Sequence, residues 1–252
     1  MACVSNHPVL QHKLTLLRKS STTTKVFREL LREITFYLGY EATQNLPLKD
    51  VTIKTASSSN ECLGKKLDAK VLLVPILRSG LGMVEPMTNL LPFAEIYHLG
   101  MYRERQSLVP VIYYDNLPRN TNCEIAIILE PMVATANSIL AAISLIKSGP
   151  NPKQIVLISL VISREGLLVL QEEHPEVIVH AASVSDSVNE DGKLIPGLGD
   201  VGDRLFGTGL GSIHKAAASP KNPDFYTHHS NSTTKAQLME GSENRASKKQ
   251  KR

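Results

Sequence analysis

The chain has no tryptophan, only three cysteines and few aromatic residues, which make up 5% of its 252 residues. The wide spacing of Cys3, Cys62 and Cys123 argues against a disulfide framework and against a clustered metal site. The chain also lacks an apolar run of the roughly 18 residues that a membrane helix requires, and residues 1–25 have no signal-peptide pattern. We therefore expect a cytoplasmic globular protein with no membrane partner.

Positive charge is concentrated at the C-terminus. Residues 215–252 contain 8 Lys and Arg against 3 Asp and Glu, whereas the preceding 214 residues contain 20 against 21. The nearly neutral body therefore has no electrostatic footprint for nucleic acid. Because apolar periodicity is lost, we expect a basic, disordered tail over 215–252 after one domain over 1–214. The basic cluster at 248–252 leaves nuclear localisation and a nucleic-acid contact of the tail open.

Short apolar runs alternate with amphipathic stretches through the body of the chain. Four of the runs are typical of strands that are buried on both faces of a parallel sheet: Val71–Leu77, Ile125–Leu129, Ile155–Ile162 and Val177–His180. The spacing of apolar residues predicts helices from near Lys25, over Ser138–Lys147 and over Glu165–His174. Thr55–Asn60 is small and polar, which is typical of a loop. The alternation predicts an α/β fold with a doubly wound, mostly parallel sheet that binds ligands beyond the carboxyl ends of its strands.

The segment from Glu130 to Ser138 has the composition of a phosphate cradle. An apolar strand ends at an acid, small and hydroxyl residues follow, and we expect a helix to begin at Ser138. Unpaired N–H groups at a helix start attract phosphate, and Thr135 and Ser138 add hydroxyl donors. Glu130 is placed to hold ribose hydroxyls, directly or through a cation. An ordinary strand–helix connection with Ser138 as its N-cap is the alternative for this segment.

Two glycine-rich loops also carry charged residues. In the first, which follows Val71–Leu77, Arg78 offers a fork for phosphate oxygens, and Gly80 and Gly82 permit a close approach. The second, Leu194–Thr208, contains four glycines, two aspartates and an arginine, and its backbone groups can pair with the edge of a planar amide ring. A surface arginine and a glycine-rich turn with a local Asp–Arg pair are the corresponding structural alternatives.

Three strings together resemble the hallmarks of the uracil phosphoribosyltransferase family: VPILRSGLGM, EPMVATANS and PGLGDVGDRLFGT. The resemblance spans residues 7–208 and implies a type I phosphoribosyltransferase core, with a hood built from the N-terminal helix and the C-terminal segment. It also implies that uracil and 5-phosphoribosyl-1-diphosphate (PRPP) are converted to UMP and pyrophosphate in pyrimidine salvage. Mg²⁺ would be held mainly by PRPP, without a dedicated protein ligand set. Members are usually homodimers or homotetramers, and some are regulated by GTP.

The resemblance further implies roles for individual residues. PRPP would be bound by Arg78, Arg103, Asp200 and the loop residues Glu130, Pro131, Met132, Val133, Ala134, Thr135, Ala136, Asn137 and Ser138. Uracil would be bound by Leu194, Gly199, Asp200 and Val201. No residue would form a covalent bond with substrate, and Arg78 and Asp200 would stabilise charge and orient the substrates.

The same loops depart from the family pattern at several positions. Glu130 stands in place of an aspartate, Ala136 and Asn137 replace a glycine pair, Lys193 replaces a tyrosine, and Glu85-Pro86 is unusual. If a position of the former glycine pair needs a positive φ, alanine there costs about 1 kcal/mol. Two functions therefore stay open. One is an active uracil phosphoribosyltransferase, and the other is a catalytically weakened or inactive homologue that binds PRPP or a nucleotide in a regulatory role.

Overall fold

The computed structural model describes residues 2–103, 110–119, 121–189 and 192–208, without the side chains of Ser58, Ser59 and Arg103. The predicted tail over 215–252, with its basic cluster, lies outside these residues. In chain order the elements are β1 (Ala2–Val4), α1 (Pro8–Arg18), α2 (Thr24–Thr43), β2 (Leu48–Thr55), β3 (Ser58–Leu67), β4 (Val71–Leu77), η1 (Ser79–Met83), α3 (Val84–Leu90), β5 (Glu95–Ile96), β6 (Leu99–Arg103), β7 (Pro110–Asp115), β8 (Ile125–Leu129), β9 (Met132–Val133), α4 (Asn137–Ser148), β10 (Gln154–Ser163), α5 (Arg164–Glu173), β11 (Ile178–Ser185), β12 (Ser187–Val188), β13 (Leu194–Ile195) and α6 (Val201–Phe206).

A mostly parallel sheet forms the centre of the fold. Its strands follow the order β1-β11-β10-β8-β4-β6-β7, with β5 beside β4 and β9 beside β10. Within the described residues, β6 and β7 are the only antiparallel neighbours in this sheet. Chain order and strand order differ, so most connections cross over the sheet as helices, as in other parallel sheets. The predicted doubly wound, mostly parallel sheet is confirmed.

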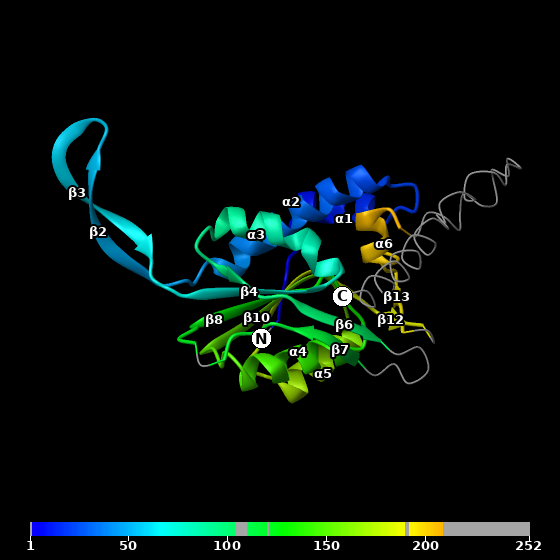
Figure 1. Cartoon of the computed structure of the whole chain (residues 1–252). Coiled ribbons are helices and arrows are strands. Elements are labelled where there is room, and N and C mark those ends of the chain that lie inside the picture. The colour runs from blue at the N-terminus through cyan, green and yellow to red at the C-terminus, as the bar shows by residue number, and fades with distance from the viewer. Residues whose placement is uncertain (1, 104–109, 120, 190–191, 209–252) are drawn as a thin grey trace, which may run out of the picture. The chain divides into compact units, whose positions relative to one another are not determined.

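Helices cover both faces of the sheet, with α1, α2 and α3 on one face and α4 and α5 on the other (Figure 1). Successive strand residues therefore enter different cores. Leu73 of β4 belongs to the buried cluster that contains Phe27 and Ile34 of α2, whereas Leu72 belongs to the cluster that contains Ile143 of α4. Because both faces are buried, the strands are continuously apolar rather than alternating. This explains why apolar runs, and not period-two patterns, mark the strands in the sequence.

The helix predictions hold, with small shifts at the ends. Thr23 is the N-cap of α2, and its hydroxyl accepts a hydrogen bond from Val26 N at 3.4 Å. Pro86 lies in the first turn of α3, where the missing N–H costs nothing. Gly149 is the C-cap of α4. No helix among the described residues is long and apolar enough to cross a bilayer.

The prediction of a loop over Thr55–Asn60 is wrong. Thr55 ends β2, and Ser58 opens β3, so only two residues connect the strands of this hairpin. Small polar residues satisfy a cross-strand ladder as well as apolar ones do, because the ladder uses backbone groups. The hairpin β2–β3 extends away from the sheet (Figure 1), and the side chain of Leu63 on β3 is 78% exposed.

The hood predicted from the N-terminal helix and the C-terminal segment is also present. Residues of α6 pack on α2 and on η1, and the Arg204 guanidinium lies 4.2 Å from the centre of the Phe27 ring. Arg28 Nε donates to Leu205 O at 2.5 Å. These contacts join residues about 180 positions apart in the chain, and they hold α6 beside the end of β4.

His180 of β11 is a buried ionisable group, with 4% of its surface exposed, that packs near Glu41 of α2. Its Nδ1 has no hydrogen-bond partner among the described residues. Burial lowers the pKa of His180, although the Glu41 carboxylate opposes the shift. The folded protein therefore binds this proton less tightly than the unfolded chain does.

We expect the free energy of unfolding to fall as the pH drops from about 7 to about 5, because the unfolded chain takes up a proton that folded His180 resists. The free energy of unfolding should stop falling once the pH is below the pKa of His180 in the folded protein. In His180→Asn, the slope of the unfolding free energy against pH should be flatter, as measured by urea titration. His12→Gln, at an exposed position on α1, is the control and should keep the wild-type slope. A wild-type slope in His180→Asn would refute this origin.

Candidate active site

Two loops meet where adjacent parallel strands end. Val71 to Pro75 of β4 pair with Ile125 to Leu129 of β8, so the chain leaves both strands at the same edge of the sheet. Gly80 lies tight against this edge, since a Cβ there would stand 2.3 Å from Leu129 O. Only glycine permits that approach. The loop that contains Arg78 and the loop that begins at Glu130 are therefore neighbours.

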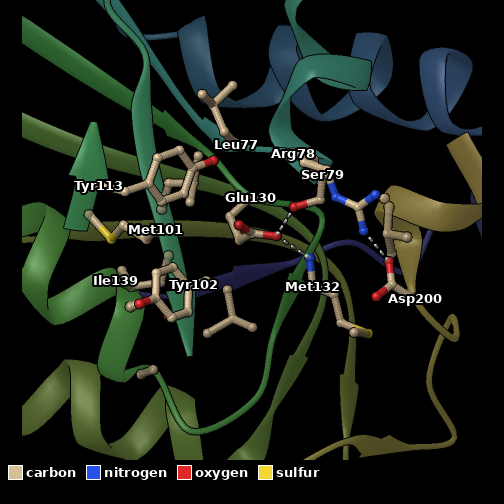
Figure 2. A pocket seen from close by; sticks show the side chains of 16 residues that line it. Leu77, Arg78, Ser79, Met101, Tyr102, Tyr113, Glu130, Met132, Ile139 and Asp200 are labelled. Carbon is tan, nitrogen blue, oxygen red and sulfur yellow. Dashed lines mark hydrogen bonds and ion pairs between the residues drawn. The ribbon is translucent and has the colours of Figure 1, made fainter. Parts of the chain in front are cut away.

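The two loops surround a cavity of about 410 Å³ at the carboxyl ends of the strands (Figure 2). Tyr102 of β6 and Tyr113 of β7 form one wall, with ring centres 6.2 Å apart. Asp200 and the start of α6 close the opposite side. Acids, an arginine, hydroxyl groups and aromatic rings thus converge on one space, a composition suited to a polar ligand with a flat part.

Arg78 is held by the segment around α6. Its Nη2 donates to Asp203 Oδ1 at 3.0 Å and lies 3.5 Å from Asp200 Oδ1. Its Nη1 donates to Thr208 Oγ1 at 3.4 Å. Gly202 makes room, because a Cβ there would lie 3.0 Å from the guanidinium. Hydrogen bonds from the Thr208 hydroxyl and then from Arg78 lower the pKa of Asp203, so its carboxylate stays charged opposite Arg78.

Glu130 lies at the centre of the cavity, directly after β8. Its Oε1 accepts a hydrogen bond from Ser79 Oγ at 2.7 Å and a long one from Met132 N at 3.5 Å (Figure 2). Glu130 N donates to Ile158 O of β10 at 3.2 Å, which fixes the backbone. The carboxylate is thus placed by its own loop and by the arginine loop together.

The segment from Glu130 to Ser138 forms the turn into α4. The helix begins at Asn137, and Ala136 is its N-cap with φ 61° and no side-chain cap. The prediction that Ser138 begins or caps the helix is therefore wrong by one to two residues. The hydroxyl of Thr135 is buried without a partner among the described residues. The Thr135 hydroxyl and the unpaired N–H groups at the start of α4 are therefore hydrogen-bond donors that a ligand oxygen could satisfy.

The cavity collects part of the residue set predicted from the sequence. The predicted residues that line it are Arg78, Glu130, Met132, Val133, Ala136, Ser138, Asp200 and Val201. The predicted residues that are not among its lining are Pro131, Ala134, Thr135, Asn137, Leu194 and Gly199. Leu194 of β13 is 5% exposed and packs in the core on the side of α1 and α2. Arg103 ends β6, but its side chain lies outside the described part of the chain.

Sequence reasoning missed several residues of the site, and four of them make contacts described above. Ser79 bonds Glu130, Tyr102 and Tyr113 form a wall, and Asp203 binds Arg78. The sequence does contain a signal for Asp203, because an acid three residues after a capping Asp is typical of a helix start. In the structure Asp200 is the N-cap of α6, and its Oδ1 accepts a hydrogen bond from Asp203 N at 2.8 Å. The sequence contains no signal for Tyr102 and Tyr113, since their place in the wall depends on how β6 and β7 lie relative to β4.

Comparisons with known proteins agree with this fold and identify the family. The family model described as uracil phosphoribosyltransferase matches residues 4–208. The chain is 48% identical over 207 residues to the uracil phosphoribosyltransferase of Clostridioides difficile, and the match covers 81% of this chain and 97% of that protein. The one of Roseiflexus sp. (strain RS-1) is 45% identical over 206 residues, covering 82% and 98%. Among solved structures, the AQ2163 protein from Aquifex aeolicus is 32% identical with a TM-score of 0.77, covering 82% of this chain and 99% of that one.

The doubly wound sheet and the family match define the class, which is that of the phosphoribosyltransferases. Within this class, the chain belongs to the uracil phosphoribosyltransferase family. The comparisons do not favour the alternative of an inactive, regulatory homologue, because curated relatives at 43–48% identity carry the name of the enzyme.

The positive φ at Ala136 makes a specific prediction. A Cβ in the left-handed region costs about 1 kcal/mol, so Ala136→Gly should raise the free energy of unfolding by up to about that amount. Urea titration at neutral pH measures the change. The matched control is Ala141→Gly in the interior of α4, which should lower stability by about 1 kcal/mol because glycine weakens a helix. Destabilisation by Ala136→Gly would contradict the strain at this position.

Proposed function

We propose that the chain is a uracil phosphoribosyltransferase that makes UMP and pyrophosphate from uracil and PRPP in pyrimidine salvage. The observation that carries the proposal is that Arg78 and Glu130 follow adjacent parallel strands and line one cavity, beside the start of α4. A cation for a diphosphate, a carboxylate for ribose hydroxyls and a helix start for a phosphate are thus within reach of one PRPP molecule.

We assign the roles of individual residues accordingly. The buried hydroxyl of Thr135 and the backbone around Ala136 to Ser138 would bind the 5-phosphate, which would satisfy the donors left unpaired there. Glu130 would hold the ribose hydroxyls, and Arg78, with Arg103, would bind the diphosphate. Asp200 and Val201, which line the cavity, would contact PRPP and uracil, and Leu194 and Gly199 would shape the uracil pocket from behind.

The reaction requires positioning rather than a covalent intermediate. As the C1–O bond of PRPP loosens, positive charge builds on the ribose and uracil N1 attacks C1. Pyrophosphate leaves with the C1 oxygen and its bonding electrons, and the proton of uracil N1 is released to the pyrophosphate or to water. Arg78 would neutralise charge on the leaving group, and the cavity wall of Tyr102 and Tyr113 would limit access of water. Binding of the diphosphate must first loosen the pairing of Arg78 with Asp203.

Mg²⁺ fits this site as a partner of PRPP. Within the described residues, no group of three or more His, Cys, Asp or Glu side chains is arranged to hold a metal ion. The carboxylates of Glu130 and Asp200 line the cavity and offer the oxygen ligands that Mg²⁺ takes. Most of the ligands would therefore come from the diphosphate and water. When bound, the ion would supply positive charge against the departing pyrophosphate.

The decisive measurement is formation of labelled UMP from labelled uracil with PRPP and Mg²⁺. Arg78→Ala should lower kcat/KM about a hundredfold, because it removes a charged contact to the leaving group. Asp200→Ala should lower it about tenfold or more, for loss of a ligand contact and of one partner of Arg78. Lys153→Ala, an exposed residue at the opposite edge of the sheet, is the control and should match wild type. Wild-type protein that binds PRPP without forming UMP would refute the proposal.

We further propose that the protein is a homodimer or a higher homo-oligomer in which the hairpin β2–β3 contacts a second copy. An isolated two-stranded hairpin is marginal in water. Leu48, Leu63 and Leu67 share one face of the hairpin and Ile53 lies on the other, and all four are exposed. Because apolar side chains stand on both faces, a surface that receives the hairpin from two sides is needed to cover them.

Leu63→Glu should shift the protein toward monomers, because a charge would have to be buried at the contact. Light scattering during gel filtration measures the mass. The control is Leu168→Glu on α5, where a leucine is 52% exposed outside the hairpin, and the mass should not change. An unchanged oligomer in Leu63→Glu would contradict a role of this face.

Two finer expectations accompany the proposal. Regulation by GTP, implied by the resemblance for some relatives, is examined by adding GTP to the UMP assay. A cytoplasmic location stays a prediction. The nuclear alternative depended on the basic cluster at 248–252, which lies outside the described residues, and we do not propose it.

A further inference from the structure

A side-chain hydrogen bond joins the two loops that would bind PRPP. Ser79 Oγ, in the arginine loop, donates to Glu130 Oε1 at 2.7 Å (Figure 2). The same oxygen also accepts a long contact, 3.5 Å, from Met132 N. Ser79 and Glu130 both line the cavity. The shorter of these two contacts thus comes from a residue outside the loop of Glu130.

The backbone is built to bring Ser79 to this point. Ser79 opens η1 directly after Arg78, and Gly80 presses the turn against Leu129 O at the end of β8. Any side chain at position 80 would push the turn outward, because its Cβ would also meet Pro75 Cα at 3.2 Å. Ser79 Oγ would then move away from the carboxylate that follows Leu129. The hydrogen bond from Ser79 to Glu130 therefore depends on the close approach of the backbone at Gly80.

A glutamate needs such a contact more than a shorter acid does. Three side-chain torsions separate its carboxylate from the backbone, and fixing them costs conformational entropy when a ligand binds. A hydroxyl donor to a charged oxygen is a strong hydrogen bond, and it can be formed before the ligand arrives. Ser79 thus holds one oxygen of Glu130 in place while the carboxylate still faces the cavity.

We propose that Ser79 is a positioning residue that orients the Glu130 carboxylate toward the ribose hydroxyls of PRPP. The inference rests on the proposed function and deepens it, because it names what sets the ribose contact of this site. Since Arg78 and Ser79 are consecutive, the same turn that presents a cation to the diphosphate also sets the carboxylate for the ribose. The diphosphate and the ribose of PRPP would then be recognised by one turn of the chain.

Four variants test the role: Ser79→Ala, Ser79→Thr, Glu130→Asp and the double variant Ser79→Ala/Glu130→Asp. Loss of one hydrogen bond to a charged group should raise the KM for PRPP about tenfold in Ser79→Ala. The KM for uracil and the thermal midpoint should stay near wild type, which a merely structural role of Ser79 would not allow. Ser79→Thr keeps the hydroxyl and should restore the KM for PRPP.

The double variant still tests the proposal if the threonine of Ser79→Thr does not fit the turn. The aspartate of Glu130→Asp is one methylene too short to reach Ser79, so adding Ser79→Ala to it should change the KM for PRPP by less than about twofold. The same tenfold effect in both backgrounds would overturn the proposal, as would a Ser79→Ala enzyme with wild-type KM for PRPP. If wild type forms no UMP, the proposed function fails, and calorimetric titration of PRPP into the same variants still tests the positioning of Glu130.

Discussion

The pairing of β4 with β8 is the constraint on which the rest of the site depends. Their parallel register, with Pro75 opposite Leu129, brings both chains to the edge of the sheet at the same height. Because both strands are buried on two faces, sliding one by a residue would move its apolar side chains from one core to the other. The cores on the two faces thus hold the register, and the register holds Arg78 beside Glu130. The positions of the site residues are thus set by the packing of core residues that lie outside the cavity.

Charges in and beside the cavity are arranged so that Arg78 is paired with carboxylates of the chain itself. Arg78 pairs with Asp203 and Asp200, which belong to a segment more than 120 residues further along the chain. All three side chains are partly exposed, so the pairs are individually weak and are exchangeable for a diphosphate. This arrangement keeps the guanidinium aimed into the site without a large cost when it changes partners. It also ties the cover formed by α6 to the loop after β4.

Much of the fold was predictable because its signals are local. The buried strands appear as apolar runs, and α2 appears as a helical stripe behind a threonine cap. The errors arose where a local signal is weak or misleading. The residue types favour Ser138 as the start or cap of α4, whereas the helix begins at Asn137 and its N-cap is Ala136, with a positive φ. The hairpin tip at Thr55–Asn60 looked like a loop because a backbone ladder needs no apolar residues.

The sequence by itself determined the class of fold, the three loops of the site and the family, since these depend on residue types and spacings along the chain. Only the tertiary structure decided which of the predicted residues face one cavity, that Leu194 is buried in the core, and that Ser79, Tyr102, Tyr113 and Asp203 belong to the site. These residues come from separate strands and helices. Their meeting depends on strand order and on the close approach at Gly80 and Gly202, which are properties of packing between distant segments and leave no periodic trace in the sequence.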